Sequence, residues 1–188
     1  MIKTAVLLID IQNDYFPGGA MECVKSIKAG ENAGKILQWA RDRRVIPIHI
    51  RHISTRPGAS FFLPGTVGSE IHELVSPLSG ERIIIKNFPN SFRETNLEEI
   101  LRENNIERLI ITGMMTHMCI DTTTRAATDL GYSCILIHDA CATRELTFED
   151  ERVPSHYVHA SFISSLSGLY ARIFSTEEFL SNQEFNPS

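Results

Sequence analysis

The sequence predicts an α/β protein in which a six-stranded parallel sheet is covered by helices on both faces. Six short apolar runs alternate along the chain with longer amphipathic stretches. This alternation is typical of strand–helix–strand units, which build parallel sheets buried on both faces. The length of 188 residues fits one domain, and no repeat, low-complexity tract or Pro/Ser-rich linker divides it. We expect a single domain over residues 1–181 and a flexible tail over residues 182–188.

Each predicted strand is a run of four to six mainly apolar residues that ends at polar or turn residues. In chain order the strands are 4–9, 45–50, 82–85, 108–112, 133–137 and 171–175. Pro47 has no backbone N–H to donate, so the second strand is expected to start near it.

The helices are predicted where apolar residues recur at helical spacing between these strands. They cover 27–43, 96–104, 119–130 and 153–166, and a last helix starts at 177–180. Gly131 is expected to end the third of them. The longest irregular stretch is 51–68, and a loop of that length in a compact domain is usually functional or mobile.

Charge and hydropathy exclude several classes of protein. The 18 basic and 23 acidic residues give a net charge of −5, so no basic excess indicates a nucleic-acid or membrane partner. The apolar runs are much shorter than the ~18 residues that a membrane span needs. The N-terminal run 5–9 is also too short for a signal peptide. We therefore expect a cytoplasmic protein whose four cysteines are thiols.

Three reactive residues stand where predicted strands end, and parallel α/β sheets bind ligands at that edge. Asp10 follows the first strand, Lys86 the third, and Cys119 starts the helix after the fourth. Taken singly, they could be a turn residue, a solvated strand end and a small buried residue. Together they form a set of nucleophile, base and cation. A thiol at a helix N-terminus beside an ammonium is expected to have a lowered pKa.

The same residues carry a family resemblance. The segments LIDIQNDYF (8–16), IKNFPNSF (85–92) and TGMMTHMCIDTTTRAA (112–127) resemble the isochorismatase-like cysteine hydrolases. Segments 63–71 and 131–142 fit the same pattern, and the resemblance extends from about residue 4 to residue 174. Three separate motifs in the right order make it specific.

The resemblance implies a Rossmann-like, three-layer α/β/α sandwich with a catalytic triad. Asp10 is then the general base, Lys86 the stabilising cation and Cys119 the nucleophile. A cis peptide joins Met114 to Met115, and the backbone N–H groups of Met115 and Cys119 form an oxyanion hole. The implied reaction is cleavage of an amide, carbamoyl or ureido C–N bond of a small molecule, through a thioester on the cysteine.

One branch of the family, the nicotinamidases, binds a metal through an Asp-x-His motif and a further histidine. Here the motif reads Ile50-Arg51-His52, and Phe61 stands at the second histidine position. One ligand in three does not make a transition-metal site. We therefore predict no catalytic metal and no cofactor. A nicotinamidase and a vinyl-ether hydrolase of the isochorismatase type stay as alternatives.

The substrate residues are less sharply indicated. Arg51 could bind a substrate carboxylate or be an exposed charge at a strand end. Aromatic residues in the loops could wall a pocket for a small planar ligand, and His117 precedes the nucleophile by two positions. The candidates are Phe16, Arg51, Phe61, Phe88 and His117. The family resemblance also implies a homo-oligomer, either a dimer or a tetramer.

Two rival functions are compatible with a sheet of this type or with the family. A nucleotide-binding module would suit the same type of sheet, but no G-x-G-x-x-G follows the first strand, and 30–36 departs from a P-loop. A catalytically silent family member is disfavoured because all three residues of the triad are present.

Overall fold

The predicted strands form one parallel sheet in the computed structural model, which describes residues 2–185. The order across the sheet is β3-β2-β1-β4-β5-β8. The strands are β1 (Thr4–Ile9), β2 (Ile46–His52), β3 (Arg82–Lys86), β4 (Arg108–Met114), β5 (Ser133–Ala142) and β8 (Arg172–Phe174). The chain order reverses between β1 and β4, so a switch point lies there, and parallel sheets bind ligands at that position.

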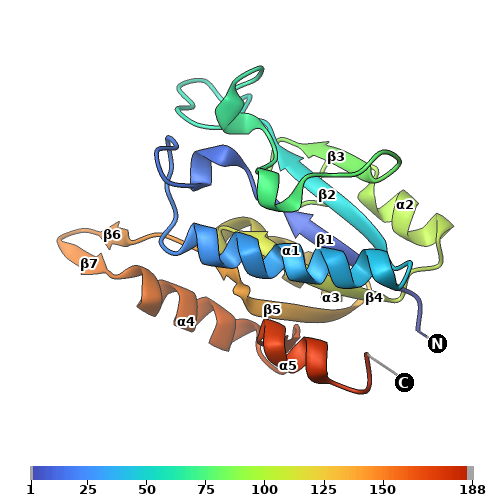
Figure 1. Cartoon of the computed structure of the whole chain (residues 1–188). Coiled ribbons are helices and arrows are strands. Elements are labelled where there is room, and N and C mark those ends of the chain that lie inside the picture. The colour runs from blue at the N-terminus through green and yellow to red at the C-terminus, as the bar shows by residue number, and fades with distance from the viewer. Residues whose placement is uncertain (1, 186–188) are drawn as a thin grey trace.

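Helices cover both faces of this sheet, which confirms the three-layer arrangement. They are α1 (Ser26–Asp42), α2 (Leu97–Glu103), α3 (Asp121–Asp129), α4 (Ser155–Leu166) and α5 (Thr176–Ser181). Residues of α1 and α5 share one core, whereas residues of α2, α3 and α4 share the other. Figure 1 shows α1 lying across the near face of the sheet with α5 beside its lower edge.

Alternation along the central strands builds these two cores. Val6 and Leu8 of β1 pack with α1, while Leu7 and Ile9 point into the opposite core. All four side chains are buried, because successive residues of a strand face opposite sides of a sheet that is covered on both. This explains why the strands read as continuous apolar runs.

The predicted helix over 153–166 was wrong at its start. The chain first forms a two-stranded antiparallel hairpin of β6 (Leu146–Phe148) and β7 (Glu151–Val153). Helix α4 begins only at Ser155. The reason is Pro154, because a residue that precedes proline is driven out of the helical region towards extended backbone. The hairpin projects from the end of the molecule in Figure 1.

The predicted helix over 119–130 also begins differently. The segment Thr116–Ile120 forms a π turn, and the α-helix α3 starts at Asp121. Four strands also continue past their predicted ends. β2 ends at His52 and β3 at Lys86, while β4 continues to Met114 and β5 to Ala142. A register shift between β4 and β5 accommodates the extension.

The expected flexible tail is packed over its first part. Phe185 is 8% exposed and stacks on Phe179 of α5 with ring centroids 4.8 Å apart. Glu184 forms ion pairs with Arg108 and Arg172. The rest of the predicted tail, 186–188, lies outside the described residues. Within residues 2–185, no helix has both the length and the apolar character needed to cross a bilayer.

Candidate active site

The three reactive residues predicted from the sequence meet at the carboxyl edge of the sheet. Asp10 follows β1, Lys86 is the last residue of β3, and Cys119 lies in the π turn after β4. Lys86 Nζ is 2.7 Å from Asp10 Oδ2 and 3.2 Å from Cys119 Sγ. The side chains of Asp10 and Lys86 are wholly buried, and Cys119 is 5% exposed. A buried carboxylate, ammonium and thiol are therefore in direct contact.

The backbone around β1 and β4 brings these groups together. Asp10 has a φ of +51°, a conformation that aspartate tolerates better than most residues, and its N–H donates to the carbonyl of Ile50. Gly113, on the neighbouring strand, has a φ of +130°, and a Cβ at this position would overlap the carbonyl oxygen of Ile9. Only glycine permits β4 to approach β1 so closely at this point.

The turn that carries Cys119 starts at a cis peptide bond between Met114 and Met115. The N–H groups of Met118 and Ile120 both donate to the carbonyl of Met115, at 3.0 and 3.3 Å. The N–H of Cys119, which lies between them, does not share that acceptor. The N–H of Met115 lies at the cis bond itself, directly after the end of β4. These two N–H groups are the predicted oxyanion hole.

Lys86 has two further acceptors besides Asp10 and Cys119. Its Nζ lies 3.1 Å from His52 Nδ1 and 3.0 Å from the carbonyl oxygen of Phe88. His52 and Lys86 are direct partners in the register of β2 against β3. His52, which the sequence offered only as one of three possible metal ligands, is thus a neighbour of the buried ammonium.

Burial and charge set the protonation states. Burial disfavours the charged form of Lys86, but Asp10 and then Cys119 outweigh it, so the pKa of Lys86 is raised and the side chain is an ammonium. Burial also raises the pKa of the Cys119 thiol, and Asp10 adds to this effect more than Lys86 offsets it. The expectation of a lowered thiol pKa was therefore wrong, because desolvation dominates. The resting residue is a neutral thiol that needs a base.

A metal-ligand geometry exists at the same place. Ligand atoms of Asp10, His52 and Cys119 all lie within 4.8 Å of one another. However, the ammonium of Lys86 is within 3.2 Å of each of them. A metal ion would have to displace or discharge this ammonium, so these residues fit a metal poorly. At the other family positions for metal ligands, Ile50 is buried in the core and Phe61 packs on Tyr15.

The candidate substrate residues are engaged within the protein. Phe16 is buried and stacks on His72 with ring centroids 3.6 Å apart. The ring of Phe88 lies beneath the guanidinium of Arg93, while its carbonyl accepts from Lys86.

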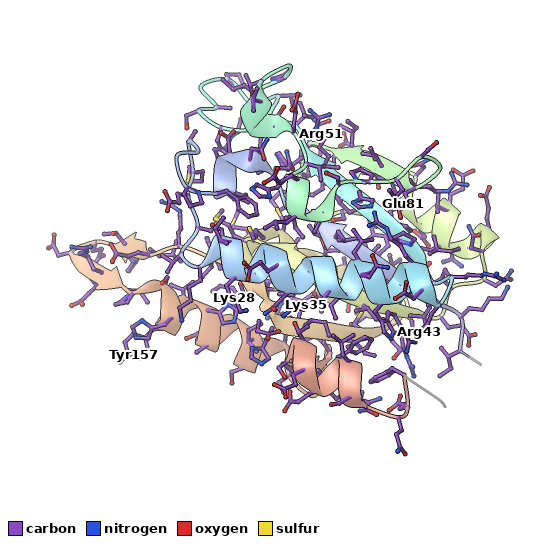
Figure 2. All side chains as sticks on the ribbon, in the orientation of Figure 1. Lys28, Lys35, Arg43, Arg51, Glu81 and Tyr157 are labelled. Carbon is purple, nitrogen blue, oxygen red and sulfur yellow. The ribbon has the colours of Figure 1, made fainter. Side chains whose placement is uncertain are left out.

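Two other candidates hold neighbouring segments. Arg51 donates through Nε to the carbonyl of Ser69 at 2.7 Å, and Figure 2 shows it at the end of β2 beside the loops that follow. Such a contact makes Arg51 a link between strand and loop. His117 is half-buried, and its Nδ1 is hydrogen-bonded to Thr143 Oγ1. Whether any candidate touches a substrate stays a prediction.

Two residues missed by the sequence argument hold the long segment 51–68 against the site. Asp14 Oδ2 accepts from the N–H of Phe62 at 2.6 Å. Gln12 Nε2 donates to the carbonyls of Ser69 and His52, at 2.8 and 2.9 Å, and its Oε1 accepts from the N–H of His52. The signal in the sequence was the polar run that follows the first buried strand.

Comparisons with known proteins place this geometry among relatives. A family model described as Isochorismatase domain matches residues 4–160. The uncharacterized isochorismatase family protein YddQ from Bacillus subtilis is 48% identical over 179 residues, which cover 95% of this chain and 99% of the relative. A crystal structure of an isochorismatase-type hydrolase from Oleispira antarctica has a TM-score of 0.92 and 45% identity, and covers 96% of this chain and 97% of its own.

More distant relatives have named activities. The nicotinamidase of Escherichia coli is 25% identical over 178 residues, covering 75% of this chain and 84% of the relative. The maleamate amidohydrolase of Pseudomonas putida is 24% identical over 156 residues, covering 76% and 73% respectively.

Proposed function

Because the chain belongs to the isochorismatase family of hydrolases, we propose that it is a cysteine hydrolase that cleaves a C–N bond of a small molecule. The observation that carries this proposal is the buried contact of one ammonium, Lys86, with both a carboxylate and a thiol. Such a cluster is expensive to bury, and it supplies the groups that covalent acyl transfer requires. The relatives named as amidohydrolases support C–N cleavage.

The proposed reaction begins with the neutral thiol. Asp10 takes the proton from Cys119, and Sγ attacks the carbonyl or carbamoyl carbon of the substrate. The developing oxyanion is held by the N–H groups of Met115 and Cys119, and donors of this kind are worth ~3–4 kcal/mol each. The C–N bond breaks and the leaving amine takes the proton from Asp10. Water then hydrolyses the thioester, again with Asp10 as the base.

Lys86 stabilises the charge that this proton transfer moves. When the thiol proton passes to Asp10, the negative charge moves from the carboxylate to a sulfur that is 3.2 Å from the ammonium. The ammonium contacts the negative charge both before the transfer, on Asp10, and after it, on Cys119, so little reorganisation is needed. The ammonium of Lys86 contacts all three candidate metal ligands, Asp10, His52 and Cys119. We therefore propose that the reaction needs no catalytic metal.

A panel of substrates tests the proposal with the purified protein. It contains nicotinamide, maleamate, N-carbamoyl amino acids, ureidoacrylate, biuret and isochorismate, and turnover is read as ammonia release and by chromatography. We expect ammonia release that is lost in Cys119→Ala and insensitive to EDTA. Cys134→Ala is the matched control, because this buried thiol on β5 faces Thr128 of α3, and the change should leave activity unchanged.

Three results would overturn parts of the proposal. Turnover by Cys119→Ala at the wild-type rate would exclude the thioester. Loss of activity in EDTA would establish a metal, and turnover of isochorismate alone would favour ether cleavage. Iodoacetamide tests the thiol chemistry without a known substrate, since Cys119 should react faster than the other three thiols.

Two further expectations accompany this function. We propose that the chain forms a homo-oligomer, which light scattering on the purified protein measures directly. We also propose a cytoplasmic location, which fractionation of the source cells would test.

A further inference from the structure

The ammonium of Lys86 has more acceptors than hydrogens. A lysine ammonium carries three N–H donors. Four groups lie around Nζ. It is hydrogen-bonded to the carbonyl of Phe88 at 3.0 Å, His52 Nδ1 at 3.1 Å and Cys119 Sγ at 3.2 Å, and it forms an ion pair with Asp10 Oδ2 at 2.7 Å. At any moment at least one acceptor must share a donor or go without one.

Two of these acceptors are fixed by their surroundings. The carbonyl of Phe88 belongs to the backbone. His52 is held on both sides of its Cα, because Gln12 accepts from its N–H at 2.7 Å and donates to its carbonyl at 2.9 Å. The ring of His52 also packs at a tilt against the buried ring of Phe62, with centroids 5.9 Å apart. The position of Nδ1 is therefore set by β2 and the polar run after β1.

If His52 or the carbonyl of Phe88 did not accept an N–H of Lys86, that N–H could be donated to Asp10 instead. Its Oδ1 and Oδ2 are both fully buried, and neither accepts a hydrogen bond from any residue in the described range 2–185. An N–H from Lys86 would satisfy one of these oxygens, and hydrogen bonds to a carboxylate make it a weaker base. The proposed reaction needs Asp10 to remain basic enough to take a proton from a buried thiol.

We propose that His52 is a positioning residue whose Nδ1, together with the carbonyl of Phe88, occupies two of the three N–H donors of Lys86. The third N–H stays on Cys119 Sγ, and the charge of the same ammonium faces Asp10, while the thiol proton passes from Cys119 to Asp10. The S–H bond breaks, an O–H bond forms, the negative charge moves from oxygen to sulfur, and the ammonium keeps all its protons. This inference rests on the proposed thiol chemistry of Cys119.

The charge state of His52 agrees with the role of acceptor. Burial lowers the pKa of His52 to about 4, with Asp10 opposing this shift and Lys86 and Arg56 adding to it. The ring is therefore neutral at neutral pH, and its Nδ1 lone pair is available. Below about pH 4 the ring becomes a cation that cannot accept from Lys86.

NMR of the ¹⁵N-labelled protein tests the contact without a substrate. We expect His52 to be the Nε2–H tautomer, with an unprotonated Nδ1 at pH 7 and a titration near pH 4. Lys86→Met should raise this titration point, because it removes the cation next to the ring. A Nδ1–H tautomer, or a titration near the ordinary histidine value of ~6.5, would overturn the contact whatever the enzyme acts on.

Variants of His52 test its role in the chemistry. His52→Phe keeps a ring without an acceptor, so its rate of Cys119 alkylation and its kcat should fall by ~10-fold or more, with KM little changed. His52→Asn places an oxygen near the Nδ1 position and should recover most of that loss without the titration near pH 4. His49→Gln is the control, because this buried histidine on the same strand contacts Glu81.

The outcomes separate the two proposals. Equal losses in His52→Phe and His52→Asn would show that the ring only fills space, which overturns the positioning role. An unchanged alkylation rate in His52→Phe would overturn it as well. If Cys119→Ala retains turnover, the proposed function fails, whereas the NMR result still decides whether His52 accepts from Lys86.

Discussion

Replacing Lys86 by methionine tests how the buried cluster is held together. The change keeps the length of the side chain but removes the ammonium that faces Asp10. Both side chains are wholly buried, and Asp10 Oδ1 accepts no hydrogen bond from residues 2–185. The variant therefore leaves a carboxylate in the interior without its cation.

Breaking a buried ion pair from one side costs about 3–5 kcal/mol. A domain of this kind has only about 5–15 kcal/mol of stability, so Lys86→Met should lose a large share of it. The acceptors at His52 and the Phe88 carbonyl also lose their donor, which places the expected loss towards the upper end of this range.

Urea unfolding followed by the fluorescence of Trp39, the single tryptophan, measures this loss. The double variant Asp10→Asn/Lys86→Met should recover at least about 2 kcal/mol, because it removes the stranded charge. Acidification should also reduce the deficit of the single variant, since a protonated carboxyl carries no charge. A loss below about 1 kcal/mol, or a double variant no more stable than the single one, would refute the reasoning.

The remaining predictions concern the backbone and pH. In a thermal unfolding assay, Gly113→Ala should destabilise the fold by about 3 kcal/mol or more, because its Cβ would overlap the carbonyl of Ile9 at a φ of +130°. Gly131→Ala should cost about 1 kcal/mol in the same assay, because this position has a φ of +93° but lies in open space. Equal losses would contradict this account. A hydrogen bond from Arg41 is the main cause that lowers the pKa of Glu81 from 4.5 to about 2. Glu81 therefore stabilises the fold above about pH 4.5, and this contribution is lost as the pH falls towards 2. Glu81→Gln should flatten the acid limb of a stability–pH curve, and an unchanged limb would exclude this pair as its source.

Local patterns were sufficient for the sheet and for the identity of the reactive residues. The first strand was predicted with its observed bounds, because Thr4–Ile9 is an apolar run that ends at polar residues. Asp10, Lys86 and Cys119 could be selected because parallel strands bring their carboxyl ends to one edge. The wrong start of α4 had a local cause too, since Pro154 indicated extended backbone at the preceding Val153.

The sequence by itself therefore determined the fold class, the family and the three groups at the strand ends, since hydrophobic periodicity and motifs are properties of neighbouring residues. Only the tertiary structure decided how those groups behave. The register of β2 against β3 places His52 beside Lys86, and no pattern in either strand specifies that pairing. Burial turned the expected thiolate at Cys119 into a neutral thiol. Both register and desolvation depend on segments far apart in the chain, so they arise only when the chain is folded.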